Sequence, residues 1–330
     1  MATKLTRSGP IRSRLTASVT AVAVLWLANV ARAADDNRPV VITANQATYS
    51  LAVALTGQTP IEIVNIPADG RQLSLLRDYI GRRMDRLAPI FASATAVISM
   101  TNALPADPIY RFARDANIRI VDIEAASPWS LDSAGVALVD APVSNVAWAA
   151  DTDTSNAETA PYFWLSVSNA IRMADIIAHD LGQLFPDAAN RIAGNLDTLK
   201  RSLLDLRNEY QSSLIEAGDD TVFALANDFV YLTNDMGLYV DGYFIKQDIR
   251  WTDDDLSNLT AHLERNDIKA VIHKWQPSEA IQQAVADAGA TLVVLDAGDP
   301  GMTEDDVLLA DGLQRVLRRN LEAISAALRN

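Results

Sequence analysis

Histidine is the side chain best suited to bind a metal or move a proton, and the chain has three: His179, His262 and His273. His273 directly follows the apolar run at residues 270–272, which we predict to be a strand. Ligand sites of α/β proteins gather at the carboxyl ends of strands. His179 and His262 fall in helical patterns, where surface or packing roles are expected. His273 is therefore a candidate site residue.

The common catalytic and phosphate-binding motifs are missing from the sequence. It contains no G-x-S-x-G, no H-E-x-x-H, no P-loop and no G-x-G-x-x-G. Residues 151–156 alternate oxygen-bearing side chains, but they lack the glycine and glutamate of a calcium loop, so we expect a solvated acidic loop. These absences favour a binding protein over an enzyme.

Composition excludes several further classes. The chain has 330 residues, no cysteine and a formal charge of −14. Without cysteine there are no disulfides, thiolate metal sites or lipid-modified cysteine. The acidic balance argues against a nucleic acid or an anionic membrane as partner, because phosphate binding needs a basic surface.

The N-terminus has the pattern of a secretory signal peptide. Four basic residues precede an apolar stretch at residues 15–30, and Ala31 and Ala33 form a small-x-small cleavage site. This stretch of 16 residues is shorter than the roughly 20 that span a bilayer, which disfavours a transmembrane anchor. We predict a cleavable signal peptide at residues 1–33 and a periplasmic location. Cleavage removes five positive charges and no negative ones, which moves the formal charge from −14 to −19.

Apolar runs alternate with amphipathic stretches in both halves of the chain, which predicts an α/β fold with mainly parallel sheets flanked by helices. The expected strands lie at residues 40–43, 61–66, 96–99, 118–123, 222–225, 238–244, 270–272 and 291–295. The expected helices lie at residues 47–55, 73–91, 108–117, 228–236, 253–266, 278–288 and 304–328. We expect two lobes, at residues 34–185 and 217–330.

A long helical pattern at residues 186–216 separates the two halves. Apolar residues recur there at steps of four and three from Ile192 to Leu206. About 30 residues give a rod of about 45 Å, longer than one lobe. We therefore predict that one long backbone helix bridges the lobes and limits their relative motion.

Four stretches, taken in order, resemble a known family. Residues 161–170 (PYFWLSVSNA) are similar to the pattern D-P-H-x-W-L-x-x-x-N-A, and residues 186–210 to an inter-lobe helix. Residues 225–238 are similar to F-H-D-A-Y-x-Y-F…Y-G-L, and the stretches 270–278 and 291–296 to A-I-F-x-E-x-Q-x-S and V-x-V-L-D. The chain thus resembles the cluster A-I solute-binding proteins of zinc and manganese ABC transporters, the zinc-uptake type in particular, over about residues 40–328.

The resemblance implies a metal held by three histidines and one carboxylate from both lobes. The first histidine would fall near Asp69, where the sequence has none. The second aligns with Tyr162, the third with Ala226, and the next family aspartate with Asn227. The carboxylate, Asp296, is kept. Most of the metal-ligand histidines are therefore missing, and we expect a degraded metal site.

One hypothesis is that the protein still serves transport but takes another solute. A metal chelate or a small organic molecule would then be held by Tyr162, Asn227, Asp296 and Lys274. Lys274 stands where the family commonly has a glutamate. In the structural alternative, Lys274 pairs with Asp296 and replaces the charge of the metal.

Two other hypotheses follow from the same residues. A harder divalent cation such as manganese, or zinc with a non-standard ligand set, would use Asp69, Asp228, Asp296 and His273. Alternatively, the protein has lost metal binding and works as an accessory or partner-binding module. For transport, the resemblance implies an ABC permease in the inner membrane as partner and a monomeric binding protein without enzymatic activity.

Overall fold

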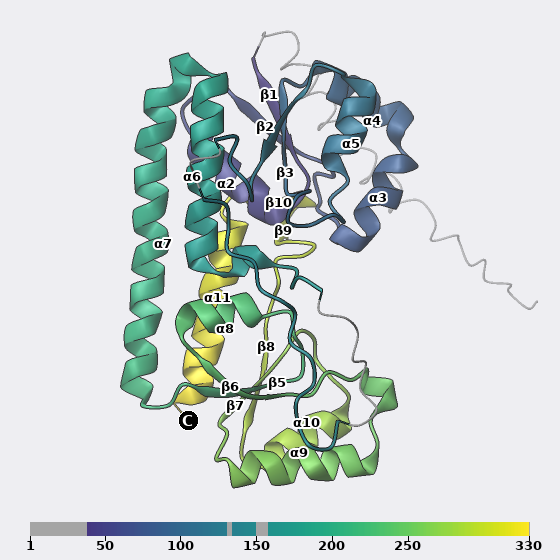
Figure 1. Cartoon of the computed structure of the whole chain (residues 1–330), viewed down its shortest axis with the longest axis vertical. Coiled ribbons are helices and arrows are strands. Elements are labelled where there is room, and N and C mark those ends of the chain that lie inside the picture. The colour runs from purple at the N-terminus through teal and green to yellow at the C-terminus, as the bar shows by residue number, and fades with distance from the viewer. Residues whose placement is uncertain (1–37, 131–133, 150–157, 330) are drawn as a thin grey trace, which may run out of the picture.

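The computed structural model describes residues 38–130, 134–149 and 158–329, which form two α/β lobes joined along a long helix (Figure 1). The predicted signal peptide and the acidic loop predicted at 151–156 lie outside the described residues. None of the described helices is long and apolar enough to cross a membrane.

The N-terminal lobe holds a parallel four-stranded sheet with the order β2-β1-β3-β4. Strands β1 and β3 are fully buried, as expected for central strands that are covered by helices on both faces. The strands are β1 (Val40–Thr43), β2 (Glu62–Asn65), β3 (Ala96–Ser99) and β4 (Val121–Glu124). The helices are α2 (Gln46–Thr56), α3 (Leu73–Gly81), α4 (Met84–Ser93) and α5 (Ile109–Ala116).

The C-terminal lobe repeats this topology with the order β6-β5-β7-β8. Its strands are β5 (Thr221–Ala224), β6 (Tyr239–Tyr243), β7 (Ala270–His273) and β8 (Thr291–Val294). Its helices are α8 (Val230–Met236), α9 (Asp253–Arg265), α10 (Glu279–Asp287) and α11 (Gly312–Leu328). In both sheets the strand order reverses between the two central strands, which is where α/β sheets bind ligands.

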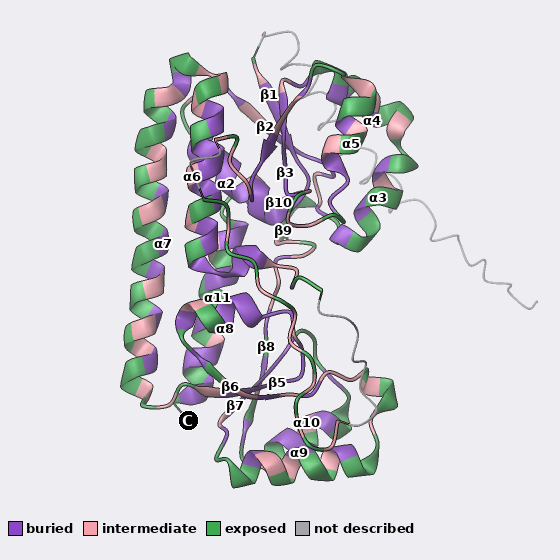
Figure 2. Ribbon diagram, in the orientation of Figure 1, coloured by how far each residue is buried: buried purple, intermediate pink, exposed green. Residues whose placement is uncertain are grey.

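The predicted inter-lobe helix is confirmed as α7 (Ala189–Ala217), which follows a short 3-10 turn at Pro186–Ala188. Its apolar stripe is buried while its outer side is exposed (Figure 2). The helix ends at Gly218, whose φ of +72° is a left-handed conformation that suits glycine. Helix α6 (Val167–Leu184) packs along α7; no bounds were predicted for it from the sequence, although His179 of this helix was placed in a helical pattern.

Two of the predicted helices differ from the structure. The helix expected at 73–91 is divided into α3 and α4, because Arg83 has φ −119° and interrupts the helical backbone. The helix expected at 304–328 begins only at Gly312. Before it, β9 (Thr303–Glu304) and β10 (Val307–Leu308) form a hairpin, with Asp305 and Asp306 at positive φ in its turn.

The lobes are joined by more than α7. The loop at residues 296–311, which includes β9 and β10, leaves the C-terminal sheet and packs on the N-terminal lobe (Figure 1). Gln46 of α2 fixes this loop, since its side chain donates to the Leu309 carbonyl and accepts from the Met302 N–H, both at 2.9 Å. The segment at 134–149 crosses in the opposite direction, and its half-buried Trp148 stacks on Phe223 of β5.

Candidate functional site

The carboxyl ends of β5 and β7 place Asp228 and Lys274 side by side. The Lys274 Nζ donates to Asp228 Oδ1 at 3.3 Å and lies 3.1 Å from Oδ2. The prediction that Lys274 pairs with Asp296 is therefore wrong. The reason is strand order: β5 and β7 are neighbours, whereas Asp296 follows β8 on the far side of β7.

His273, the last residue of β7, is buried in the same region. Its Nε2 lies 3.7 Å from a carboxylate oxygen of Asp248, and its ring packs against Trp275. Its Nδ1 is buried and has no hydrogen-bond partner among the described residues. Burial lowers the pKa of His273, so the ring is neutral at pH 7.

These side chains line a cavity of about 250 Å³, which we call the carboxyl-edge cavity. It is formed by the chain that follows β5, β6 and β7, so it lies at the point where the strand order reverses. Its charged and aromatic lining consists of Asp228, Lys246, Arg250, His273, Lys274 and Trp275. Four of the predicted site residues, Asn227 included, therefore come together in one cavity.

Asn227 also has a structural contact. Its Nδ2 donates to the carbonyl oxygen of Pro142 at 3.1 Å, which ties the 134–149 segment to the C-terminal lobe. The amide group is thus partly used by the fold, and its remaining oxygen is a weak ligand for a cation.

Tyr162 links the two lobes through Asp299, a residue that the sequence analysis did not identify. The Tyr162 hydroxyl donates to the Asp299 carboxylate, and Asp299 Oδ1 accepts the N–H of Leu73 at the start of α3 at 3.0 Å. Burial raises the pKa of Tyr162, and it raises the pKa of Asp299 to about 6. The phenol is therefore neutral at pH 7 and occupies the position that the resemblance gives to a histidine.

The other predicted carboxylates take part in local contacts. Asp296 Oδ1 accepts the N–H of Gly298 at 2.8 Å, and the Asp296 backbone is paired with the Asn320 side chain. Asp69 is about 40% exposed and lies 3.2 Å from Arg71. Asp299 follows Asp296 by three residues in the 296–311 loop. This closeness to a predicted site residue is the signal in the sequence that could have identified Asp299.

The donor atoms present do not fit a tetrahedral zinc ion. Zinc takes about four ligands, mostly histidine nitrogen, thiolate sulfur or carboxylate oxygen, in deprotonated form. The aligned positions instead supply a neutral phenol at Tyr162, a methyl group at Ala226 and an amide at Asn227. Within the described ranges, no group of three or more histidine, aspartate or glutamate side chains is placed to hold a metal.

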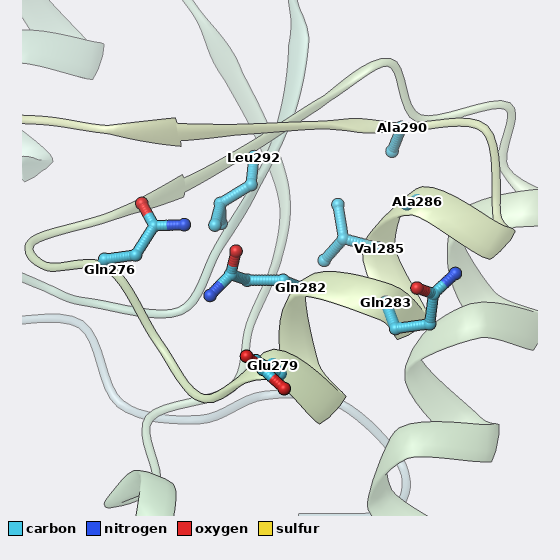
Figure 3. A pocket seen from close by; sticks show the side chains of 8 residues that line it. All are labelled: Gln276, Glu279, Gln282, Gln283, Val285, Ala286, Ala290 and Leu292. Carbon is cyan, nitrogen blue, oxygen red and sulfur yellow. The ribbon is translucent and has the colours of Figure 1, made fainter.

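A second cavity, of about 450 Å³, lies between α10 and β8 (Figure 3). It is lined by Gln276, Gln282 and Gln283 together with Glu279 and apolar residues. Two of these amides are bonded within their own helix region, Gln282 to the Pro277 carbonyl and Gln283 to Asp287. None of the predicted site residues lines it, so we assign the candidate site to the carboxyl-edge cavity.

Comparison with protein families identifies the kind of protein. A family model described as the periplasmic component A of the zinc-uptake complex matches residues 94–327. The chain belongs to this family. Its members are periplasmic solute-binding proteins of ABC transporters and are not enzymes. This confirms the resemblance that we drew from the four sequence stretches.

Solved structures show the same fold at low sequence identity. A mutant of FpvC from Pseudomonas aeruginosa has a TM-score of 0.69 and 20% identity over 88% of this chain and 99% of that one. Zinc-bound AdcA from Streptococcus pneumoniae has a TM-score of 0.63 and 18% identity, covering 89% of this chain and 58% of that one. A structure of ZnuA has a TM-score of 0.60 and 16% identity, covering 88% of this chain and 98% of that one. A search of curated protein sequences finds no match.

Proposed function

We propose that the protein delivers a metal to an ABC permease of the inner membrane, and that the metal is carried as a chelate rather than as a bare ion. Membership of the zinc-uptake family supports the transport role. The observation that carries the proposal is the carboxyl-edge cavity, whose lining combines the Lys274–Asp228 ion pair with the buried His273 Nδ1, which has no hydrogen-bond partner among the described residues. A chelate brings its own donor atoms, so it does not need the missing histidines.

A bare divalent cation fits this region poorly. Lys274 lies against Asp228 and repels a cation from the carboxylate that would hold it. The other carboxylates considered for manganese are committed elsewhere, Asp69 to Arg71 and Asp296 to the Gly298 N–H. Manganese prefers about six oxygen ligands, and these contacts leave too few.

We also propose the cellular setting and the domain limits. The signal peptide at residues 1–33 is removed and the mature chain acts as a monomer in the periplasm. Its parts are an N-terminal lobe at 34–185, the inter-lobe helix at 186–216 and a C-terminal lobe at 217–330. The family's periplasmic location and the charge pattern of the N-terminus support this arrangement.

The second candidate function is that of an accessory protein that binds another protein instead of a metal. The contact between Tyr162 and Asp299 favours it, because the resemblance aligns Tyr162 with a metal-binding histidine and its hydroxyl is instead bonded to Asp299.

Uptake of labelled metal distinguishes the two candidates. Zinc and manganese are supplied to cells with and without the protein, each as a simple salt and as a citrate complex. We expect cells without the protein to take up at least one of the citrate complexes severalfold more slowly, and the wild-type chain to restore the rate. Unchanged uptake in every case would contradict transport and support the accessory function.

A further inference from the structure

We propose that the N-terminal lobe carries an arginine-rich face that binds the surface of an anionic phospholipid membrane. The arginine-rich face is the exposed side of residues 71–119, which include α3, α4 and α5. The inference goes beyond the proposed function, because this surface lies outside the carboxyl-edge cavity and its role does not depend on the transported solute.

The charge of this face is opposite to that of the whole chain. Residues 71–119 contain eight arginines, no lysine and four aspartates, and one of the aspartates, Asp107, is buried. Their formal charge is +4, whereas the whole chain carries −14, so the remaining residues together carry −18. All eight arginines are exposed. The arginine-rich face is therefore a region of positive potential on an acidic protein.

The fold gathers these arginines on one side of the N-terminal lobe. Helices α3, α4 and α5 pack against one another on the side of the sheet away from α6 and α7 (Figure 1). Each helix buries apolar side chains, such as Leu76, Leu87 and Ile109, and keeps an exposed outer side (Figure 2). Residues of this face line neither of the two cavities described above, so it offers an open surface rather than a pocket.

Most of these arginines are available to a partner. Arg71 pairs with Asp69 at 3.2 Å and Arg82 with Asp78 at 3.4 Å, and both ion pairs are exposed to solvent. Exposed ion pairs of this kind contribute little to stability, so exchanging them for a lipid phosphate costs little. The other six have no ion-pair partner in the part of the chain that the structure describes: Arg77, Arg83, Arg86, Arg111, Arg114 and Arg119.

Tyrosine side chains hold several of the guanidinium groups in place. The guanidinium carbon of Arg83 lies 4.1 Å from the centre of the Tyr79 ring, and that of Arg71 lies 5.3 Å from it. Arg114 donates to the Tyr110 hydroxyl at 3.0 Å. A planar guanidinium binds a phosphate through two parallel hydrogen bonds, which a lysine ammonium does not. Arginines that are already ordered lose less conformational entropy when they bind.

Apolar side chains beside the arginines favour a membrane over an acidic protein as the partner. Leu75 is 53% exposed and Ile118 is 72% exposed, and each lies within two residues of an exposed arginine. Tyr79 and Tyr110 are half-buried on the same helices. Arginine, tyrosine and exposed aliphatic residues are typical of surfaces that lie at lipid headgroups, where cations meet phosphates and apolar side chains reach the acyl boundary. The spread of the arginines over three helices also suits a surface of many phosphates better than a single anion.

The negative charge of the rest of the chain does not cancel this attraction. Exposed charges farther from the membrane than about 8 Å are largely screened at physiological ionic strength, so the nearest charges decide the sign of the interaction. When α3, α4 and α5 face the membrane, the nearest charges are those of the arginine-rich face. The whole-chain charge, which argues against an anionic membrane, therefore does not describe this surface.

Vesicle flotation of the protein purified from the periplasm tests the proposal. The probes are vesicles of phosphatidylcholine alone and vesicles of phosphatidylcholine with phosphatidylglycerol, which is anionic. At about 0.1 M salt we expect severalfold more protein to float with the anionic vesicles, and at about 1 M salt, where the Debye length is about 3 Å, we expect this difference to disappear.

Substitutions locate the contact. The double variant Arg86→Gln with Arg111→Gln should bind the anionic vesicles about 25-fold more weakly, since each arginine near an anionic lipid surface contributes about fivefold. The matched control is Arg191→Gln with Arg201→Gln, which removes the same charge from exposed positions of α7, on the other side of the sheet (Figure 1). The control should bind like the wild type. Far-UV circular dichroism shows whether each variant has folded.

Several results would overturn the assignment. They are no binding to the anionic vesicles at the lower salt concentration, equal binding to both kinds of vesicle, or equal weakening by the double variant and its control. Binding to poly-glutamate without binding to vesicles would assign the face to an acidic protein and would likewise contradict the membrane proposal. None of these results changes the test of the transport function, which is made by metal uptake.

Discussion

The Trp164→Ala variant should lose about 4 kcal/mol of its free energy of unfolding, because truncating a fully buried aromatic side chain leaves a large cavity. Trp164 is 1% exposed and packs edge-on against Tyr162 and Phe163. Its Nε1 donates to the carbonyl oxygen of Ala297 at 2.9 Å, so the substitution also removes a bond from the N-terminal lobe to the 296–311 loop. Denaturant unfolding at pH 7 measures the change.

Two further substitutions make this result specific. Trp275→Ala removes an indole that is 46% exposed and should cost less than about 1 kcal/mol. Trp164→Phe keeps most of the packing and loses the hydrogen bond, so its cost should lie between the two. A Trp164→Ala loss no larger than that of Trp275→Ala would show that Trp164 does not hold the lobes together.

The second large effect is expected for Gly70→Ala, which should cost about 3 kcal/mol through backbone strain and overpacking together. Gly70 has φ +68° in the loop after β2, and a Cβ there would lie 2.4 Å from the carbonyl oxygen of Pro300. The contact joins the N-terminal lobe to the 296–311 loop. Neither backbone can move without disturbing the bond between Leu308 N–H and the Ala68 carbonyl.

Gly218→Ala is the matched control for this prediction. Gly218 has a similar φ of +72°, but no atom lies within 4 Å of the added Cβ. Its cost should therefore be about 1 kcal/mol, the strain of a left-handed alanine alone. The difference between the two variants, measured by denaturant unfolding, gives the energy of the close approach. Equal costs would contradict a tight contact between the loop and the lobe.

Together these contacts explain why we expect small lobe movements. Trp164 with Ala297, Tyr162 with Asp299, and Gln46 with Leu309 all tie the 296–311 loop to the N-terminal lobe. The carboxyl-edge cavity is lined by the C-terminal lobe alone. A ligand bound there does not need the lobes to close over it.

The sequence predicts the elements that follow a simple periodic rule. Strands β1 and β3 are short apolar runs, and α7 shows an apolar stripe on one side, so both kinds of element could be recognised. Helix α6 was given no bounds, although Ser168, Arg172, His179 and Gln183 form an exposed polar side at helical spacing opposite its buried residues. The β9–β10 hairpin was missed because its turn uses two aspartates at positive φ rather than glycine.

The site could be predicted only as far as the strand ends. His273 was expected at the end of a strand, whereas Asp228 and Lys274 became candidates through the family resemblance, and the structure places all three at one cavity. Their pairing depends on strand order, which periodicity does not contain, and so the partner of Lys274 was assigned wrongly. Asp299 is brought to Tyr162 by tertiary packing between segments more than a hundred residues apart.

The metal content of the protein purified from the periplasm tests most directly whether the protein binds its metal as a chelate rather than as a bare ion. Elemental analysis after gel filtration is combined with melting curves in zinc, manganese and EDTA. We predict no retained zinc or manganese and no change in Tm with either ion alone or with EDTA. About one equivalent of metal that survives gel filtration, with a Tm that falls in EDTA, would contradict this, since a ligand bound only to the folded state stabilises it.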